Sequence, residues 1–268
     1  MKPYAEVIGD PISHSKSPLL HGFWLKALGI DAEYRATHVP PKDLGAFFEE
    51  RRSDFAWRGC NITLPHKEAA LDHVADPGGV RASIGAINTA LPRDGTIIGT
   101  NTDAGGFFAP LADMELEGAH VALVGAGGAA RAILFALARV GVDRVTLLNR
   151  NVLKAGALLG RFGLKGDAVP LDTPLPPVDL LVNSSPLGMT GQPALDLDLA
   201  PLPEHAVVYD IVYAPLETAL LAQARARNLE TVDGLEMLIG QAALAFTLFF
   251  DAEPPRERDA ELRALLTR

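Results

Sequence analysis

The segment Gly125-Ala-Gly-Gly-Ala-Ala-Arg131 constrains the fold of this chain more than any other segment. It follows the apolar run His120–Val124 and opens a helical pattern, which is the strand, loop and helix order of a dinucleotide-binding turn. In that order Gly125 permits the tight turn, Gly127 lets a pyrophosphate approach the backbone, and Ala130 allows close helix–strand packing. A plain tight turn is the alternative, and the strand-loop-helix setting favours dinucleotide binding.

The residues that follow this loop continue the same alternation. Apolar runs at Arg144–Leu148, Leu180–Val182 and Val207–Ile211 have the composition of buried strands, and a helical pattern covers Val152–Phe162. Strands and helices that alternate in this way form a parallel sheet with helices on both faces. We therefore expect residues 104–234 to form a doubly wound, Rossmann-type domain.

An earlier alternation precedes residue 104. The pattern predicts strands at 4–9, 33–39 and 57–63, helices at 19–28, 42–52 and 67–74, and a hairpin over 86–100. Residues 1–103 are therefore expected to form an α/β substrate domain with a mostly parallel sheet. Two helical patterns follow Gly234 without strand partners, so residues 235–268 are expected to pack back on this first domain.

Length, charge and cysteine content limit the classes of protein that remain. The 268 residues suit two domains, and 48% hydrophobic with 21% charged residues is ordinary for a globular protein. A net charge of -9 argues against a nucleic-acid or membrane surface, and no apolar run approaches the roughly 20 residues of a membrane span. The single Cys60 fits a reducing compartment. With one cysteine and scattered histidines the sequence has no cluster of metal ligands, so no metal site is expected. The chain starts directly with a strand pattern and no signal peptide, so a cytoplasmic location is expected.

The end of the second Rossmann strand indicates which dinucleotide is bound. NAD sites usually place Asp or Glu there, to bind the ribose 2′-hydroxyl. This chain has Asn149-Arg150 at that point, with Lys154 in the next helical turn. A guanidinium without a neighbouring carboxylate suits a 2′-phosphate, so NADP(H) is the expected cofactor. The alternative is that Arg150 and Lys154 are solvated surface residues.

Two polar turns in the first domain carry a lysine and an aspartate. Lys67 ends the segment Asn61-Ile-Thr-Leu-Pro-His-Lys67, and Asp103 ends Gly99-Thr-Asn-Thr-Asp103. An ammonium group can stabilise developing negative charge and donate a proton, so a lysine at a strand end is a candidate acid. The alternatives are a solvated lysine and an aspartate that caps the following helix.

These segments together resemble the shikimate/quinate dehydrogenase family. Each one is modest alone, but they run in the family's order over nearly the whole chain, and their conjunction is specific. The matching segments are Ser13-His-Ser-Lys-Ser-Pro18, Gly59-Cys-Asn-Ile-Thr-Leu-Pro-His-Lys67, Gly85-Ala-Ile-Asn-Thr89, Gly99-Thr-Asn-Thr-Asp103, Gly125-Ala-Gly-Gly-Ala129, Asn149-Arg150, Asn183-Ser-Ser-Pro-Leu-Gly-Met189, Asp210-Ile-Val-Tyr213 and Asp233-Gly-Leu-Glu-Met-Leu-Ile-Gly-Gln241.

The resemblance implies a role for each of the matching polar residues. Lys67 and Asp103 would form the catalytic pair. The residues that would hold the substrate are Ser15, Ser17 and Tyr213 for its carboxylate, and Thr63, Asn88 and Gln241 for its ring hydroxyls. The residues that would line the cofactor are Gly125, Ala126, Gly127, Gly128, Ala129, Asn149, Arg150, Lys154, Ile211 and Gly234.

Three positions depart from the family's pattern. The family's NADP loop usually reads Asn-Arg-Thr, whereas the third residue here is Asn151, and Lys154 replaces a frequent arginine. Both departures weaken the argument for a 2′-phosphate site, but NADP(H) is still the expected cofactor. An acidic residue that often precedes the Gly85 segment is replaced by glycine near Gly78-Gly79, so that cofactor contact is not carried over.

The resemblance implies an NADP-dependent oxidoreductase that reversibly reduces 3-dehydroshikimate to shikimate, in aromatic amino-acid (chorismate) biosynthesis. The nearest alternative is a quinate or dual quinate/shikimate dehydrogenase, and by resemblance Ser at both 15 and 17 favours shikimate. A dehydrogenase of the same plan for a folate or amino-acid substrate would have no reason for the Ser-Lys-Ser loop. A ligand-sensing protein without activity would be expected to have lost Lys67 or Asp103. The expected partners are small molecules, and a monomer or homodimer is expected.

Overall fold

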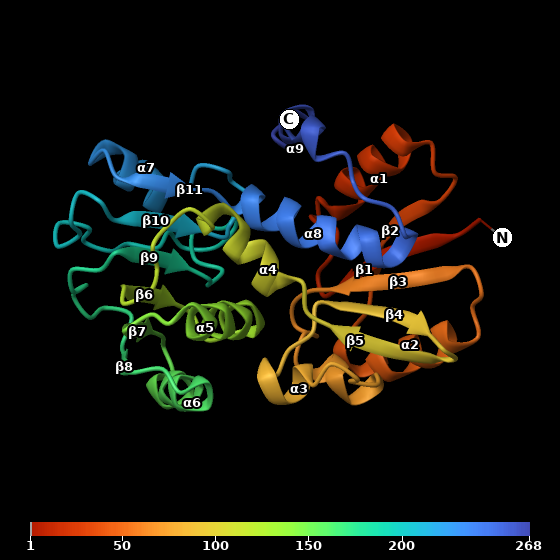
Figure 1. Cartoon of the computed structure of the whole chain (residues 1–268), viewed down its shortest axis with the longest axis horizontal. Helices are drawn as coiled ribbons and strands as arrows, with labels where there is room; N and C mark the ends of the chain where they lie inside the picture. The colour runs from red at the N-terminus through yellow and green to blue at the C-terminus, as the bar shows by residue number, and fades with distance from the viewer. Residues whose placement is uncertain (1) are drawn as a thin grey trace. The chain divides into compact units, whose positions relative to one another are not determined.

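The computed structural model describes residues 2–268 and divides the chain into two compact units. The first unit comprises the residues up to Asp103 together with Ile239–Arg268, and the second comprises Ala104–Leu238. Each unit has its own β-sheet (Figure 1). The chain leaves the first unit after Asp103 and returns to it within the long helix α8 (Gly234–Phe250).

The first unit has a five-stranded mixed sheet in the order β2-β1-β3-β4-β5. Its strands are β1 (Tyr4–Gly9), β2 (Glu33–His38), β3 (Trp57–Ile62), β4 (Thr89–Arg93) and β5 (Thr96–Thr100). β1 pairs in parallel with β2 and β3, while β4 pairs antiparallel with β3 and β5. All six residues of β1 are buried, and its one charged residue, Glu6, is paired with Arg51 at 2.7 Å, as a buried carboxylate requires.

Helices from both ends of the chain complete this unit. They are α1 (Ser17–Leu28), α2 (Leu44–Arg52), α3 (Val80–Ser83) and α9 (Asp259–Leu266), with 3-10 turns η1 (Pro41–Asp43), η2 (Ala69–His73) and η4 (Arg256–Arg258). α1 starts with Pro18 in its first turn and ends at Gly29, whose φ of 65° permits the left-handed cap. The rings of His21 and Trp24 on α1 lie 5.8 and 5.4 Å from the ring of Phe246 on α8. The C-terminal segment therefore packs on the first unit.

The second unit has a six-stranded, wholly parallel sheet in the order β11-β10-β9-β6-β7-β8. Its strands are β6 (His120–Val124), β7 (Arg144–Leu148), β8 (Gly166–Val169), β9 (Leu180–Asn183), β10 (Val207–Asp210) and β11 (Glu230–Val232). Its helices are α4 (Asp103–Phe108), whose first residue belongs to the first unit, α5 (Gly128–Val140), α6 (Val152–Phe162) and α7 (Ala219–Ala226), with the 3-10 turn η3 (Ala109–Leu111). Read from β8 inward and numbered within the unit, the strands follow the doubly wound Rossmann order, so the expected fold class is confirmed.

The core of the second unit is divided by its sheet. Along β6, Val121 and Leu123 join one buried cluster, while Ala122 and Val124 join another, as the alternation of side chains in a strand requires. The first cluster includes buried residues of α5 and α6, and the second includes buried residues of α7. A central strand buried on both faces needs a continuous apolar sequence, which is what residues 121–124 supply.

Two predicted helices differ from the structure. Residues 67–74 form turns followed by η2, because the start of this segment is held by hydrogen bonds to other parts of the unit. The ring of His66 makes a hydrogen bond to the carbonyl of Val39 at 2.6 Å, and the amide of Ile87 donates to the carbonyl of Lys67 at 2.8 Å. The apolar pattern of residues 107–114 also predicts a linking helix before the Rossmann-type domain; in the structure this helix begins earlier, at Asp103, and is followed by η3.

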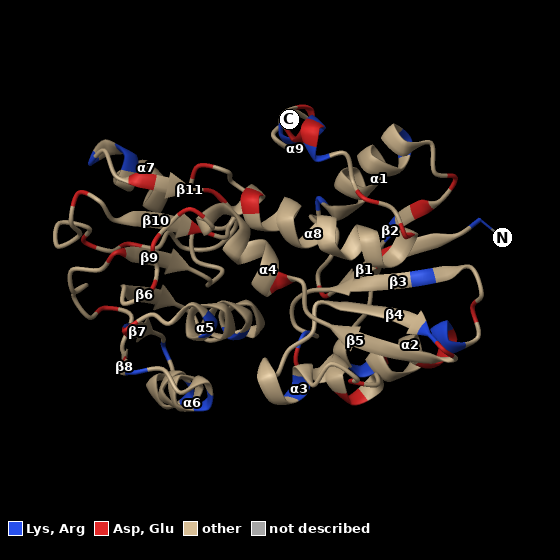
Figure 2. Ribbon diagram, in the orientation of Figure 1, with Lys and Arg blue, Asp and Glu red and all other residues tan. Residues whose placement is uncertain are grey.

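Charged residues of both signs occur on both units (Figure 2). Several of them form exposed ion pairs within one helix or turn, such as Arg258 with Glu261 at 2.6 Å. Isolated exposed pairs of this kind contribute little to stability. None of the helices in residues 2–268 has both the length and the hydropathy that a membrane span requires.

Candidate functional site

Lys67 is held by its backbone in the turn that follows β3. The amide of His66 donates to the carbonyl of Thr63 at 2.9 Å and closes the turn. The carbonyl of Lys67 accepts from the amide of Ile87, which joins this turn to the segment that leads into β4. The lysine is therefore presented from a turn with long-range hydrogen bonds, at the carboxyl end of a strand.

The side chains of Lys67 and Asp103 form an ion pair. The Nζ atom of Lys67 lies 2.5 Å from Oδ2 of Asp103, and the two side chains are only 13% and 5% exposed. This burial argues against a solvated lysine. Asp103 is the first residue of α4, but its two oxygens accept hydrogen bonds from the side chains of Lys67 and Asn88. The carboxylate is thus directed toward the first unit's polar cluster.

Asn88 is the centre of this cluster. Its Nδ2 lies within hydrogen-bond distance of Thr102 Oγ1 at 2.8 Å, Asp103 Oδ1 at 2.9 Å and Gln241 Oε1 at 3.3 Å. Its Oδ1 accepts from the amide of Thr102 at 2.7 Å. One amide side chain therefore joins the catalytic candidates to Gln241 on α8, and the structure brings four of the predicted site residues together.

Further polar residues extend the cluster, and the sequence pattern did not assign them a role. Asn61, on β3, accepts from the hydroxyl of Tyr34 at 2.6 Å and donates to Thr89 at 3.2 Å. Thr102 contacts Asn88 twice. The only signal for Asn61 and Thr102 was their place in the segments quoted for the family resemblance, and Tyr34 lay outside all of them.

The serine loop and Thr63 lie at two other points of the first unit. Ser17 is buried at the start of α1, and its amide donates to Oγ of Ser15 at 3.3 Å. Thr63 directly follows β3, and its methyl group lies where a side chain at Gly9 would be, 2.6 Å from the position of a Cβ atom. Gly9 therefore makes room for Thr63 beside the end of β1.

The glycine-rich loop joins β6 to α5 with the geometry that a pyrophosphate site needs. Gly125 has a φ of 105°, and a Cβ atom there would lie 2.9 Å from Oγ of Ser184, so no other residue fits without displacement. A Cβ atom on Gly127, the N-cap of α5, would meet nothing within 4 Å. The open space at Gly127 and the amides of Gly128 and Ala129 at the helix start fit a bound anion. Ala126, between the two glycines, is buried.

The loop after β7 contains the residues expected to select the dinucleotide. Asn149 donates from its side chain to the carbonyl of Asn151 at 2.9 Å, and Asn151 caps α6 by accepting from the amide of Lys154 at 2.9 Å. Asn151, which departs from the family's usual threonine, therefore has a structural role as helix cap. Arg150 and Lys154 are both exposed, so their charged groups are accessible to a phosphate.

Ile211 and Tyr213 follow β10, whose last residue, Asp210, has a buried carboxylate that holds the loop by hydrogen bonds. Asp210 accepts from Thr218 Oγ1 at 2.7 Å, from Asn183 Nδ2 at 2.9 Å and from the amide of Val212 at 3.0 Å. Burial raises the pKa of the Asp210 carboxyl, while these three hydrogen bonds oppose the rise. Burial also raises the pKa of the Tyr213 phenol above its ordinary value.

Gly234 opens α8 against the same loop. A Cβ atom at this position would lie 2.5 Å from the carbonyl oxygen of Ile211, so the close approach requires glycine. Ile211, Tyr213 and Gly234 all belong to the second unit, whereas Ser15 and Ser17 belong to the first.

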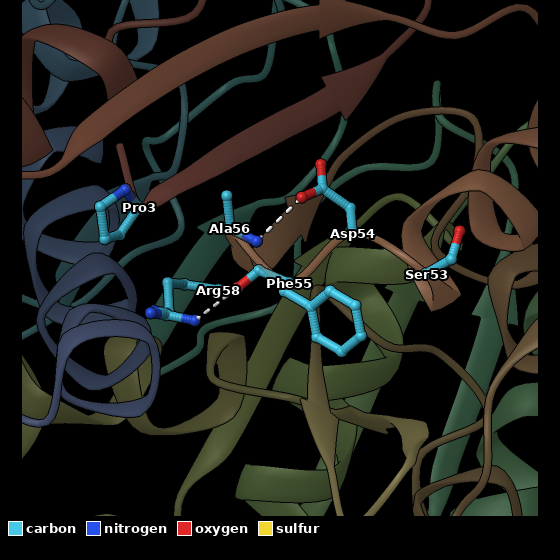
Figure 3. Close-up of a pocket in the computed structure, with 6 residues that line it drawn as sticks. All are labelled: Pro3, Ser53, Asp54, Phe55, Ala56 and Arg58. Carbon is cyan, nitrogen blue, oxygen red and sulfur yellow. Dashed lines mark hydrogen bonds between the residues drawn. The ribbon is translucent and has the colours of Figure 1, made fainter. Parts of the chain in front are cut away.

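A surface hollow of the first unit lies away from these residues (Figure 3). It is lined by Pro3, Ser53, Asp54, Phe55, Ala56 and Arg58. The hollow lies where the chain enters β3 at Trp57, whereas Lys67 follows the other end of that strand. In α/β sheets ligands bind beyond the carboxyl ends of strands, so this hollow is not the expected site. No group of His, Cys, Asp and Glu within residues 2–268 could hold a metal ion.

Comparison with known proteins identifies the family. The family model for the shikimate dehydrogenase substrate binding domain matches residues 7–90, that for shikimate / quinate 5-dehydrogenase matches 110–184, and that for the shikimate 5'-dehydrogenase C-terminal domain matches 234–261. A shikimate dehydrogenase (NADP(+)) of Sphingopyxis alaskensis is 65% identical over 98% of this chain and 97% of its own length. The chain belongs to the shikimate dehydrogenase family.

Solved structures agree with this membership. A shikimate 5-dehydrogenase of Thermus thermophilus, in complex with NADP(H) and shikimate, has a TM-score of 0.86 and 38% identity, covering 98% of this chain and 99% of that one. A ligand-free 5-ketofructose reductase of a Gluconobacter species has a TM-score of 0.88 and 29% identity, covering 99% and 98%. The shikimate dehydrogenase fold therefore also occurs in an enzyme named for another substrate, so the substrate has to be argued from the site.

Proposed function

We propose that this chain is an NADP-dependent oxidoreductase that interconverts shikimate and 3-dehydroshikimate, with Lys67 and Asp103 as its catalytic pair. The observation that carries the proposal is the buried ion pair of these two side chains, which Asn88 joins to Gln241. Its relatives include an enzyme named shikimate dehydrogenase (NADP(+)) that is 65% identical.

Lys67 supplies the proton in the proposed reaction. A carbonyl group that accepts hydride develops negative charge on its oxygen, and a positioned ammonium both stabilises that charge and donates a proton. Asp103 holds the ammonium group at 2.5 Å and fixes its direction. Because Asn88 donates to the other carboxylate oxygen, Asp103 is itself held in place. In the oxidation direction the same amine, after losing its proton, accepts the proton of the substrate hydroxyl.

The substrate-binding roles follow from the family and from the placement of the side chains. Asn88 and Gln241 lie in the same hydrogen-bonded cluster as the catalytic pair, so their amide groups are available for ring hydroxyls near the reacting carbon. Thr63 lies two residues beyond Asn61, directly after β3. Ser15 and Ser17 are assigned to the carboxylate, as two hydroxyl donors at the start of α1. The role of Tyr213 stays a prediction.

The second unit fits a dinucleotide with a 2′-phosphate. The open space at Gly127 and the amides at the start of α5 would hold the pyrophosphate, with Ala126 and Ala129 beside it. Arg150 and Lys154 would pair with the 2′-phosphate, and Asn149 lies at the same loop. Ile211 and Gly234 would lie beside the nicotinamide end. When bound, NADPH supplies the hydride, and the chain supplies position and the proton.

A quinate or dual-specificity dehydrogenase is the second candidate. Quinate carries an additional hydroxyl group next to its carboxylate, so the residues that bind the carboxylate discriminate between the two acids. Ser17 is buried and packed at the start of α1, and serine at this position favours shikimate by family resemblance. An inactive sensor of the same fold is not favoured, because the Lys67–Asp103 ion pair is intact.

The proposal is tested by measuring kcat/KM for shikimate and for quinate, each with NADP and with NAD. The expected result is the highest value for shikimate with NADP. A higher kcat/KM for quinate than for shikimate would show that quinate is the preferred substrate. A higher kcat/KM with NAD than with NADP would show that NAD is the preferred cofactor. No turnover with any of the four pairs would contradict the proposed activity.

Three further expectations stay predictions. The first is the assignment of residues 1–103 to a substrate-binding and catalytic domain, of residues 104–234 to an NADP-binding domain, and of residues 235–268 to helices that pack on the substrate domain. The second is a cytoplasmic location. The third is the oligomeric state, a monomer or a homodimer.

A further inference from the structure

Lys16 lies between the two serines of the substrate loop, but its ammonium group contacts the C-terminal end of the chain. Its Nζ atom donates a hydrogen bond to the carbonyl oxygen of Leu266. Leu266 is the last residue of α9, and carbonyls in the last turn of a helix have no partner within the helix. A cation at this end is also favoured by the helix dipole. The ammonium group of Lys16 therefore caps the C-terminal end of α9.

The helix α9 is itself held against the first unit by buried side chains and by a contact with α1. Leu262 and Leu266 on α9 are buried, and the guanidinium of Arg258, just before the helix, lies 4.9 Å from the ring centre of Phe23 on α1. The apolar contact between α1 and α9 is incomplete, because a surface hollow of about 610 Å³ lies between them. Its lining includes Pro18, Leu19 and Phe23 of α1, and Glu261, Ala264 and Leu265 of α9. The hydrogen bond from Lys16 to Leu266 therefore adds to the packing between α1 and α9, at the point where the serine loop leads into α1.

Besides the burial of Ser17 and the first hydrogen bond of α1, from the amide of Leu20 to the carbonyl of Lys16 at 3.0 Å, the serine loop has two short-range hydrogen bonds within residues 2–268. The amide of Ser15 donates to the carbonyl of Ile12 at 3.0 Å, and the amide of Ser17 reaches Oγ of Ser15 only at 3.3 Å. We propose that Lys16 is a positioning residue, which with α9 fixes this loop in the geometry that binds the substrate carboxylate. This inference rests on the proposed function, because it takes Ser15 and Ser17 as the carboxylate-binding residues.

The test compares Lys16→Met, which keeps the length of the side chain and removes its donor, with the unaltered enzyme. The expected KM for shikimate rises about tenfold, the lower end of what one charged hydrogen bond contributes, while kcat and the KM for NADP change little. Lys16→Arg, which keeps a donor, should restore most of the affinity. Lys26→Met, at an exposed position of α1, is the matched control and should change neither the KM for shikimate nor kcat.

Shikimate methyl ester separates a positioning role from a general loss of structure. The ester lacks the negative charge, so its KM should change much less than that of shikimate in Lys16→Met. Equal losses for acid and ester would overturn the proposal. Amide hydrogen exchange over residues 12–18 should be faster in Lys16→Met than in Lys26→Met, and an unchanged rate would also overturn it.

Failure of this inference differs from failure of the proposed function. If Ser17→Ala raises the KM for shikimate and Lys16→Met does not, the link to α9 is overturned and the proposed function stands. If the unaltered chain does not oxidise shikimate, the proposed function fails. Faster exchange over residues 12–18 in Lys16→Met would then still support the link between Lys16 and α9.

Discussion

The ammonium group of Lys67 carries the proposed proton transfer, so its removal should act on the chemical step. In Lys67→Ala we expect kcat to fall by about 10²- to 10⁴-fold, the usual loss for a positioned general acid, with a much smaller change in the KM for shikimate. Lys42→Ala, at an exposed position on η1, is the matched control. Steady-state kinetics of both variants measures the effect. A near-normal kcat in Lys67→Ala would remove this residue from the mechanism.

Arg150 tests the choice of dinucleotide. Its side chain is exposed in the loop before α6, and we propose that it reads the 2′-phosphate. Because a hydrogen bond to a charged group contributes roughly 1.5–3 kcal/mol, Arg150→Ala should lower the preference for NADPH over NADH by about tenfold or more. Dissociation constants for both dinucleotides, with Arg139→Ala on α5 as control, provide the measurement. An equal loss for the two dinucleotides would show that Arg150 does not read the phosphate.

His21 predicts how stability depends on pH. It is fully buried, neither ring nitrogen has a hydrogen-bond partner among residues 2–268, and its ring stacks on that of Tyr34 with 3.9 Å between the ring centres. Burial lowers the pKa of His21 from 6.5 to about 3. The unfolded chain therefore binds a proton that the folded chain excludes, so this contribution to stability is complete above pH 6.5 and is lost as pH falls toward 3. The full difference corresponds to roughly 5 kcal/mol.

The variant His21→Phe removes this titrating group and keeps a ring in the stack. The free energy of unfolding of the original chain should fall more steeply between pH 6.5 and acid than that of His21→Phe, by about one proton in slope. His14→Ala, an exposed position in the serine loop region, serves as the control. Parallel pH dependences for the original chain and His21→Phe would contradict the prediction.

Among the elements, the segment before β4 joins the members of the polar cluster around Asn88. Asn88 contacts Thr102 and Asp103 at the start of α4 and Gln241 on α8, and its backbone carbonyl accepts from Ile62 of β3 at 2.8 Å. Asn88→Ala leaves buried polar groups without partners, each of which costs about 1–3 kcal/mol. We expect a free energy of unfolding lower by about 2–3 kcal/mol and a kcat lower by tenfold or more.

Denaturant unfolding and steady-state kinetics of the same preparation separate these two effects. Thr96→Ala, an exposed position on β5, is the control and should change neither quantity appreciably. If Asn88→Ala loses stability but keeps its kcat, the cluster supports the fold and does not position the catalytic pair.

The elements that could be predicted from the sequence are those with strong local patterns. The strands β6 and β7 and the helix α6 have the predicted bounds, because continuous apolar strands and amphipathic helices are set by local side chains. The segment after Pro65 could not be predicted as turns, because its conformation depends on hydrogen bonds to Val39 and Ile87. The short outer strands β8 and β11 have exposed residues and no clear periodicity, so they had no local signal.

The residues of the candidate site could be predicted from the sequence, but the hydrogen bonds that join them could not. Lys67, Asp103, Asn88 and Gln241 were found from motifs that lie far apart along the chain. That Asn88 joins Asp103 to Gln241 depends on how β4, α4 and α8 pack, which periodicity does not reveal. Tyr34, which supports Asn61, belongs to no motif and emerges only from the fold of β2 beside β1.

At the scale of the whole molecule, the chain combines two sheets of different construction. The first unit has the mixed sheet and contains Lys67, Asp103, Asn88 and, on α8, Gln241. The parallel sheet of the second unit carries the glycine-rich loop at the carboxyl end of β6, where doubly wound folds bind nucleotides. The proposed reaction assigns the proton to a residue of the first unit and the hydride to a molecule held by the second.

Hydride transfer between NADPH and the ring carbon of the substrate is the central claim, and isotope labelling tests it most directly. The whole chain is incubated with 3-dehydroshikimate and NADPH that carries deuterium at the transferring position of the nicotinamide, and the product is examined by mass spectrometry and NMR. The predicted result is shikimate with one deuterium at C3, formed far more slowly by Lys67→Ala. Reduction without deuterium at that carbon, or no reduction by the unaltered chain, would contradict the account.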